Sequence, residues 1–420
     1  MNFLDLFAGA GGLSEGFLRN GFKPIAHIEL DENACKTLET RSAYYYLKEN
    51  NMLDIYRRYQ RSYHKREDIR LRERQEFLNH IPQGVIEPIL NIEISEKTLS
   101  SIFNIVDERL NMMRQDEIDL VIGGPPCQAY SLVGRARDEN GMEDDPRNYL
   151  YKLYIRFLNK YQPKAFVFEN VPGILTAFNG NLFKNLQAYM KRVGYNIEAR
   201  KIDAKDLGVL QSRKRIIIIG WRKDLEFVYP IFEHCNIDYK VDDILNDLPK
   251  LRAGEEYKRF SYRRMASNYL SDTRMRNEDD IVTHHVARRH IQRDLEIYKL
   301  TVRKWDIEKA RIKYTDLPED LRTHKNVTSF LDRFKVVAGN ERYSHTVVAH
   351  ISRDGHHYIH PDINQNRSIT VREAARIQSF PDDYFFEGSR TSNFVQIGNA
   401  VPPLMAEKIA YWFKNRLEQL

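Results

Sequence analysis

The sequence has few of the features that place a protein outside a cell or in a membrane. Its 420 residues include only three cysteines, at positions 35, 127 and 235, and their spacing shows no paired pattern. A disulfide scaffold is therefore excluded, and a reducing compartment is expected. No apolar run approaches membrane-spanning length, and Met1 leads directly into a charged strand instead of a secretory signal. We expect a cytoplasmic protein.

Strong net charge and metal-ligand spacing are also missing. Lys and Arg number 65 against 59 Asp and Glu, a formal net charge of +6, which suits a nucleic-acid partner without requiring one. The histidines lack cysteines or carboxylates at ligand spacing, so we expect no metal. They include His284, His285, His290, His356, His357 and His360. The length favours two domains, and a hydrophobic fraction of 42% supports a sizeable core.

A glycine loop follows a short apolar stretch at the start of the chain. Residues 2–7 predict a strand, and a helix is predicted soon after Gly9 and Gly11. Glu29 ends a second predicted strand, about 20 residues after the first glycine, where doubly wound sheets place an acid beside ribose hydroxyls. Because no phosphate-binding lysine accompanies these glycines, the pattern favours a nucleoside cofactor.

A thiol follows a rigid loop further along the chain. The apolar run at residues 119–122 leads into Gly123, Gly124 and two prolines, and Cys127 comes next. Prolines fix φ, and glycines allow a ligand or another backbone to approach closely. A thiol presented in this way is a candidate nucleophile.

Two further predicted strands carry charged side chains. The apolar run at 165–168 delivers Glu169, which a Pro-Gly turn follows. Four isoleucines at 216–219 predict a strand buried on both faces. Arg213 and Arg215 precede them two residues apart, so an extended backbone would point both guanidiniums to the same side, where they could hold a phosphate or a carbonyl oxygen.

Taken in order, these motifs resemble those of the C5-cytosine DNA methyltransferase family. The similarity covers residues 1–40, 118–221 and 367–420. It includes Phe-x-Gly-x-Gly at 7–11, Pro-Cys-Gln at 126–128, Glu-Asn-Val at 169–171, Gln-x-Arg-x-Arg at 211–215, Arg-Glu-Ala-Ala-Arg at 372–376 and Gly-Asn-Ala at 398–400. The resemblance implies an α/β fold: a doubly wound, mostly parallel sheet of the S-adenosylmethionine-dependent methyltransferase type, with a second, smaller target-recognition domain.

The resemblance also implies catalytic roles. Cys127 would add to C6 of a cytosine flipped out of the duplex, and C5 would then accept a methyl group. Glu169 would hold N3 and the exocyclic amine, while Arg215 would grip the O2 carbonyl with Arg213 nearby. The DNA contacts implied on the cysteine loop are Gln128, Ser131, Arg135 and Arg137.

The cofactor implied by the family is S-adenosylmethionine. Phe7, Gly9 and Gly11 would line its methionine and ribose side, Glu29 would bind the ribose hydroxyls, and Asn399 would reach the same pocket. The acid that contacts the adenine is either Asp54 or Glu93, and the sequence does not distinguish them.

We expect a catalytic domain over residues 1–221 with an insertion at about 42–117, a target-recognition domain at 222–366, and a return to the catalytic domain at 367–420. In the target-recognition domain, the alternating side chains at 345–350 predict a strand, and Asp354-Gly355 predicts a hairpin turn. Helical spacing predicts a salt-bridged helix around Arg372, Glu373 and Arg376 that joins the domains. A C-terminal helix is predicted at about 404–417.

The expected partner is double-stranded DNA, bound by a monomer that provides the modification half of a restriction–modification system, with an independently acting restriction nuclease. Two alternatives stay open: a tRNA cytosine-C5 methyltransferase and a catalytically inactive DNA-binding protein. The basic, aromatic stretch at 56–66 would either follow a phosphate backbone or form an exposed charged helix.

Overall fold

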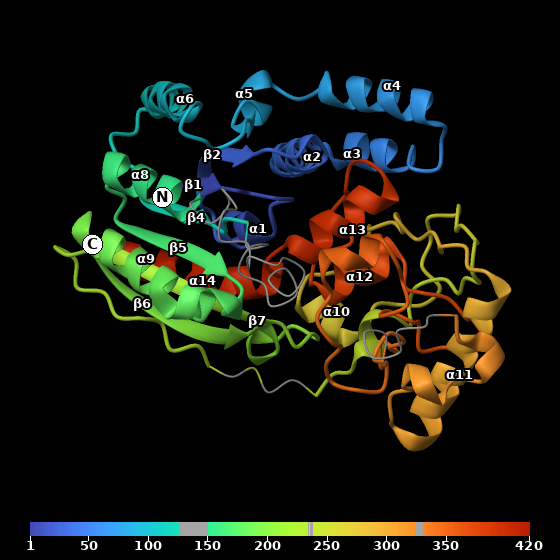
Figure 1. Ribbon diagram of the computed structural model, residues 1–420. Coiled ribbons are helices and arrows are strands. Elements are labelled where there is room, and N and C mark those ends of the chain that lie inside the picture. Colours follow the sequence, from blue (N-terminus) through green and yellow to red (C-terminus); the bar gives the residue numbers. More distant parts are fainter. Residues whose placement is uncertain (127–149, 234, 236–237, 324–330) are drawn as a thin grey trace.

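The computed structural model covers residues 1–420, and the structure is described for all of them except 127–149, 234, 236–237 and 324–330. A seven-stranded sheet has the order β3-β2-β1-β4-β5-β7-β6 (Figure 1). β7 pairs antiparallel with both neighbours, and the other pairs are parallel. The predicted doubly wound, mostly parallel fold is thus confirmed. The strands are β1 (Asn2–Leu6), β2 (Lys23–Glu29), β3 (Ile89–Asn91), β4 (Leu120–Gly123), β5 (Ala165–Asn170), β6 (Tyr195–Asp203) and β7 (Lys214–Arg222).

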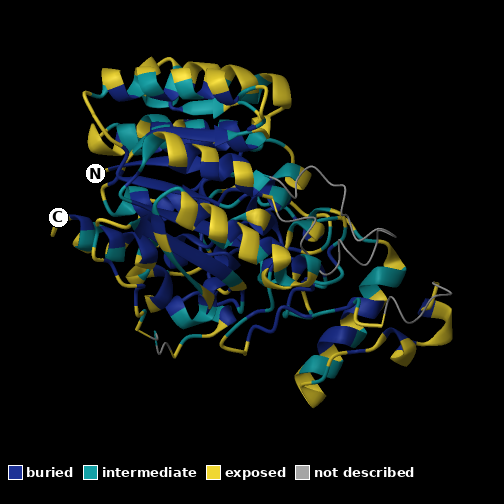
Figure 2. Ribbon diagram, turned by 60° about the vertical axis from the view of Figure 1, so that its left-hand side comes forward, coloured by how far each residue is buried: buried dark blue, intermediate teal, exposed yellow. Residues whose placement is uncertain are grey.

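Alternate residues of the central strands pack into two cores, one on each face of the sheet. Ile217 and Ile219 join a core with α1 (Gly12–Arg19) and α14 (Pro403–Leu417). Ile216 and Ile218 join the opposite core with α6 (Leu99–Met112), α8 (Leu150–Tyr161) and α9 (Asn181–Arg192). All four isoleucines are buried, which confirms the prediction of a strand covered on both faces. Figure 2 shows the buried strands between more exposed helices.

The insertion forms a helical layer beside the β2–β3 edge of the sheet (Figure 1). Within the predicted range of about 42–117, this layer comprises α3 (Leu53–Gln60), α4 (Glu67–Leu78) and α5 (Gln83–Ile86) and follows α2 (Glu32–Glu49), whereas β3 and α6 of the same range belong to the sheet and its core. Tyr56 and Tyr59 point inward and pack with Phe77 and Phe385. The aromatic residues of the basic stretch therefore serve a local core, while Arg58 and Arg61 stay exposed.

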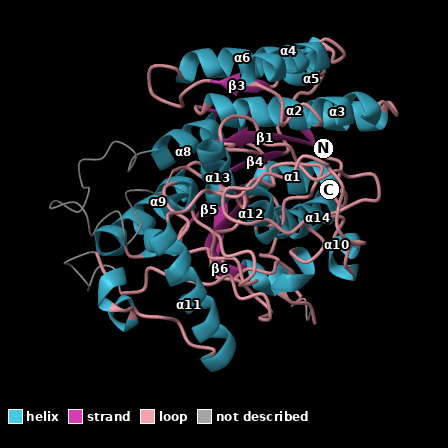
Figure 3. Ribbon diagram, turned by 90° about the vertical axis from the view of Figure 1, so that its right-hand side faces the viewer, coloured by secondary structure: helices cyan, strands magenta, loops and turns pink. Residues whose placement is uncertain are grey.

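The described part of residues 222–366, the predicted target-recognition domain and here called the target region, consists mostly of loops and short helices (Figure 3). Residues 345–350 do not form the predicted strand, because the Val347 amide donates to the Gln211 side chain and Thr346 to the Ser212 carbonyl. The prediction of a hairpin turn at Asp354-Gly355 is likewise wrong. The Tyr358 amide donates to the Gly355 carbonyl and closes a turn there, but no paired strands flank it. The helices here are α10 (Asn268–Asp272) and α11 (Gln292–Glu308), and the 3₁₀ turns are η5 (Val241–Ile244), η6 (Tyr314–Asp316), η7 (Glu319–Leu321) and η8 (Ala349–Ser352).

The chain returns to the sheet through α12 (Val371–Ile377), α13 (Arg390–Asn399) and α14, whose position confirms the predicted C-terminal helix. α12 forms as predicted, but its charged residues do not pair along the helix. Arg376 binds Asp247 and Asp382, and Glu373 binds Arg367. The helix is completely buried, so each charge needs a partner on a neighbouring segment.

Three other 3₁₀ turns, η2 (Pro172–Leu175), η3 (Ala177–Gly180) and η4 (Ala204–Leu207), connect elements around the sheet. In the described ranges, every helix is too short or too polar to span a bilayer.

Candidate active site

The strand register brings several predicted site residues to one edge of the sheet. Leu6 of β1 pairs with Gly123 of β4, and Gly123 pairs with Phe168 of β5. The residues that follow these three, including Glu169, therefore lie side by side at this edge. On the other side of β1, Leu6 pairs with Ile28, so Glu29 ends its strand at the same level. Ligands of open α/β sheets bind at this carboxyl edge.

Glu169 and Arg215 form an ion pair at this edge. The Arg215 Nε lies 2.8 Å from the Glu169 Oε1, and the two side chains are 11% and 12% exposed. β7 begins at Lys214 and runs antiparallel to β5, which places Arg215 beyond the paired residues, next to the end of β5. The pair is thus partly exposed at the edge of the sheet.

The segment that leads to the predicted nucleophile is held against Glu169. Asn170 donates through its side chain to the carbonyl of Pro125 over 3.3 Å. A Cβ on Gly124 would come within 2.7 Å of Glu169 Oε2, so only glycine permits this approach. Five predicted residues lie beyond this point, outside the described residues: Cys127, Gln128, Ser131, Arg135 and Arg137.

Arg213 does not share the surroundings of Arg215. Its side chain is fully buried and donates to the carbonyls of Val347, at 2.7 Å, and Gly398, at 3.0 Å. The expectation that both guanidiniums act side by side fails because β7 begins only at Lys214, so strand alternation does not extend to Arg213. Arg213 instead connects the target region to the end of α13.

The glycine loop between β1 and α1 has a tightly turned backbone. Phe7, Gly9 and Gly11 have φ angles of 58°, 56° and 80°, a region that glycine adopts readily and phenylalanine rarely does. The Gly11 amide donates to the Ala8 carbonyl over 3.0 Å. A Cβ on Gly9 would meet no atom within 4 Å, so this side of the loop faces open space.

Glu29 is tied to that loop. Its Oε2 accepts from the Gly9 amide at 2.7 Å, and its Oε1 accepts from the amides of Leu30 and Asp31 at 2.9 and 2.8 Å. Burial raises the pKa of Glu29, although the three N–H donors oppose this by stabilising the charged form. The structure thus brings together three predicted cofactor residues: Gly9, Gly11 and Glu29.

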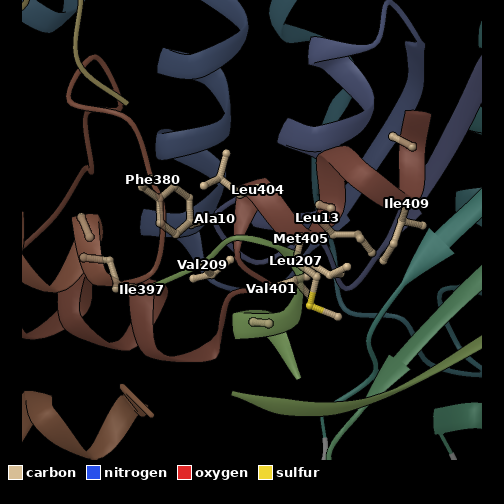
Figure 4. Packing of buried hydrophobic residues seen from close by; sticks show 14 of the residues in the cluster. Ala10, Leu13, Leu207, Val209, Phe380, Ile397, Val401, Leu404, Met405 and Ile409 are labelled. Carbon is tan, nitrogen blue, oxygen red and sulfur yellow. The ribbon is translucent and has the colours of Figure 1, made fainter. Parts of the chain in front are cut away.

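The end of α13 packs against the same loop. Asn399 is exposed at the last position of this helix. The next residues approach α1 so closely that a Cβ on Gly12 would collide with the carbonyl of Val401. Figure 4 shows Ala10, Val401 and neighbouring apolar side chains packed together behind the loop. Asn399 therefore lies beside the glycine loop despite being separated from it by most of the chain.

The two candidate acids for the adenine side lie in different places. Asp54 is exposed on α3, where it pairs with Arg57 at 3.3 Å. Glu93 is exposed two residues after β3. Asn91, which sequence reasoning missed, ends β3 directly opposite Glu29 and donates to the Leu30 carbonyl over 2.8 Å. Its position at the end of a short apolar stretch was the available signal.

Tyr384 also escaped the sequence analysis. Its hydroxyl donates to the carbonyl of Ala10 in the glycine loop, and its ring lies 4.7 Å from the Arg41 guanidinium. Arg41 in turn binds Glu15 of α1 and Asp383. Sequence patterns gave no signal for the contacts of Tyr384 with Ala10 and of Asp383 with Arg41, because each joins residues more than 340 positions apart. Among the residues that the structure describes, no group of His, Cys, Asp and Glu is arranged to hold a metal.

Comparisons with known proteins agree with this geometry. A family model described as C-5 cytosine-specific DNA methylase matches residues 1–71 and 91–415. The chain belongs to this family. Its enzymatic class is that of DNA cytosine-5 methyltransferases. The unmatched residues 72–90 fall within the insertion, in the later part of α4 and in α5.

Individual relatives extend over nearly the whole methyltransferase. Type II methyltransferase M.Bpa9945I of Bacillus paralicheniformis is 42% identical over 441 residues and covers 99% of each chain. Type II methyltransferase M.DdeI of Desulfomicrobium norvegicum is 31% identical and covers 99% of this chain and 90% of its own. A solved structure of a prophage-encoded putative DNA modification methyltransferase (E. coli) has a TM-score of 0.62 at 23% identity, over 100% and 99% of the two chains, and is similar in fold.

Proposed function

We propose that this methyltransferase transfers a methyl group from S-adenosylmethionine to C5 of a flipped-out cytosine in a specific double-stranded DNA sequence, through a covalent adduct of Cys127 at C6. The observation that carries the proposal is the alignment of the glycine loop, the Gly124-Pro125 segment and Glu169 at one sheet edge. With this alignment, a nucleoside cofactor at the glycine loop would lie next to a base bound at Glu169.

The residues around the glycine loop fit the proposed cofactor. S-adenosylmethionine, when bound, supplies an electrophilic methyl group on a sulfonium sulfur. The open side of Gly9 leaves room for a ligand, and Glu29 stands where ribose hydroxyls can donate to a carboxylate. We assign Phe7, Gly11 and Asn399 to the same pocket, with Asn91 and Glu93 at its adenine side.

Cys127 and Glu169 divide the chemistry on the base. The Cys127 thiolate forms a bond to C6, which breaks the aromaticity of the ring and makes C5 nucleophilic. Glu169 binds N3 and the exocyclic amine and favours protonation of N3 as negative charge develops on the ring. After C5 has been methylated, loss of its proton restores the C5–C6 double bond and expels the Cys127 sulfur.

Arg215 has two tasks in this scheme. Its ion pair orients the Glu169 carboxylate, and its remaining N–H groups can bind the O2 carbonyl of cytosine, where negative charge also develops. Arg213 contributes by positioning, since its guanidinium holds the carbonyls of Val347 and Gly398 around the start of β7. This assignment replaces the expectation that Arg213 acts beside Arg215 near the base.

The proposed substrate is duplex DNA. The enzyme can reach C5 of a stacked cytosine only when the base is flipped out of the duplex. We assign sequence reading to the target region at 222–366, and backbone and flipped-base contacts to Gln128, Ser131, Arg135 and Arg137. The curated relatives are named type II methyltransferases, which supports a role as the modification half of a restriction–modification system. We expect the enzyme to act as a monomer beside a separate nuclease.

The nucleophile gives the sharpest test. Cys127→Ser should abolish methylation while cofactor binding and the unfolding midpoint stay near the wild-type values. A matched Cys235→Ser variant should stay active. Duplex DNA with 5-fluorocytosine at the target should trap the wild-type enzyme covalently, because C5 then has no proton to lose. Bisulfite sequencing of DNA from expressing cells reports both product and target, and normal turnover by Cys127→Ser would refute the mechanism.

A further inference from the structure

Two basic stretches that are far apart in the sequence meet in one hollow. The hollow has a volume of about 690 Å³ and lies between Arg61, just after α3, and residues 259–265 and 276–281 of the target region. Two polar contacts join the insertion to the target region beside the hollow: His64 Nδ1 lies 2.5 Å from Glu256 Oε1, and Arg57 forms an ion pair with Asp279 at 3.0 Å. The insertion and the target region thus form a single surface here.

The guanidiniums that line this hollow are largely unneutralised. Arg61, Arg259, Arg263 and Arg264 are exposed, and none has a carboxylate at ion-pair distance within the described ranges. Arg276 differs, because it binds Asp247 at 2.5 Å. Gathering like charges costs free energy that an anionic ligand would recover.

The acidic residues of the hollow offset this charge only in part. Glu278 and Asp280 line it. Burial, with Asp383 nearby, raises the pKa of Asp280 to about 8, which weakens the negative charge that this carboxyl contributes at neutral pH. The cationic side of the hollow therefore dominates at neutral pH.

The backbone that carries these arginines is anchored, although their side chains are free to reach outward. Tyr262 donates to Asp382 over 2.7 Å, and the Arg263 amide donates to the Asp247 carbonyl over 2.9 Å. Arg276 lies 3.5 Å from the centre of the Tyr262 ring and donates to the Arg264 carbonyl. A fixed backbone with free cationic ends suits a ligand whose negative charges are regularly spaced.

The hollow lies to one side of the candidate active site. The parallel strands point to the right in Figure 1, and Figure 3 views the molecule from that side. In this view α3, which ends directly before Arg61 of the hollow, lies away from β5, which carries Glu169. A ligand that reaches both places must be extended, as duplex DNA is.

We propose that this hollow binds phosphates of duplex DNA outside the bases of the target sequence. The inference rests on the proposed function, because it takes duplex DNA as the substrate. Duplex DNA carries one negative charge per about 1.7 Å of axis, so a flanking segment offers several phosphates to neighbouring arginines. Such contacts add affinity for any sequence and leave base reading to other residues.

The test is the salt dependence of binding to random-sequence duplexes of about 12 and about 40 base pairs. A triple variant, Arg259→Gln, Arg263→Gln and Arg264→Gln, removes three cations from one side of the hollow. The matched control, Arg72→Gln, Arg192→Gln and Lys408→Gln, removes three exposed cations elsewhere. Log K falls as log salt rises, and each phosphate contact contributes about 0.9 to the magnitude of this slope. On the long duplex, the variant should therefore reduce the magnitude of the slope by about 2–3. The control should not change it.

Arg61→Gln alone should lower the same slope by about 0.9, from the insertion side of the hollow. On a short duplex that carries the target, methylation by the triple variant should equal that of wild type. An unchanged slope on the long duplex would overturn the proposal, and so would an equal loss on the short duplex, which would place the contact within the target site. If the proposed function itself failed, wild type would methylate no duplex, whereas the salt slopes need no catalysis and would still report on the hollow.

Discussion

The carboxyl edge of the sheet and the buried contact around α12 both bring arginine and carboxylate together, yet they leave these groups in different states. At the edge, Glu169 and Arg215 make one ion pair and keep some contact with solvent. Around α12, all five N–H groups of Arg376 are used, by Asp247, Asp382 and the Ile244 carbonyl.

This difference separates groups that can bind a ligand from groups that hold the protein together. A pair that keeps some exposure, and whose guanidinium carries more N–H groups than one ion pair needs, can add a substrate without losing its own contact. A buried and fully satisfied pair has nothing left to offer, and removing one partner leaves an uncompensated charge. The comparison therefore predicts losses of activity at the edge and losses of stability around α12.

The largest effect is expected at Glu169. Glu169→Gln keeps the shape but removes the charge and the proton-transfer role, so kcat should fall about 10²–10⁴-fold. The unfolding midpoint should barely move. Single-turnover methylation on target DNA measures the effect, with Glu198→Gln, on the exposed part of β6, as the matched control. A loss below tenfold would place Glu169 outside the chemistry.

The opposite pattern is expected at Arg376. Arg376→Met leaves Asp247 and Asp382 without their main counter-charge, so the free energy of unfolding should fall by about 3–5 kcal/mol. Arg342→Met, which removes one partner of an exposed pair with Asp238, should cost less than about 1 kcal/mol. Urea unfolding compares the two variants. Equal costs would mean that burial does not distinguish the α12 arginines from surface ones.

A smaller loss is expected at the cofactor loop. Glu29→Ala removes the acceptor of the Gly9 amide and, in the proposed complex, of the ribose hydroxyls. S-adenosylmethionine affinity should fall by about 1.5–3 kcal/mol. Calorimetry measures this, and DNA affinity without cofactor should stay unchanged. Glu32→Gln, in the exposed first turn of α2, is the control. Unchanged cofactor affinity in Glu29→Ala would remove this residue from the site.

The last effect is the change of stability with pH. Burial alone would raise the pKa of Glu373, but Arg367 and His360 outweigh it and hold this pKa well below 4.5, the ordinary value. A depressed pKa gives stability that is present above the unfolded-state value and is lost as pH falls toward the folded one. Glu373→Gln should therefore be destabilised relative to wild type at pH 7, and the difference should shrink below about pH 4.5. Urea unfolding at several pH values checks this, and a constant difference would contradict it.

Much of the sheet and of its carboxyl edge was predictable from the sequence, because these features depend on neighbours in the chain. Four consecutive isoleucines need two covering layers, and an acid that ends an apolar stretch must lie at a strand end. Glu29 and Glu169 were found in this way. The C-terminal helix near Leu404 followed from local periodicity in the same manner.

Contacts between distant segments were decided only by the tertiary structure. Thr346 and Val347 bind Ser212 and Gln211 instead of a partner strand, and Arg213 and Arg215 diverge because β7 begins between them. The contact of Tyr384 with Ala10, like the meeting of Arg61 with the arginines at 259–264, depends on how separate helices pack. The periodicity of a segment predicts which face of a helix or strand each side chain occupies. What lies opposite that face is set by the packing of the whole chain, because a buried charge or donor takes whichever partner the fold brings within reach.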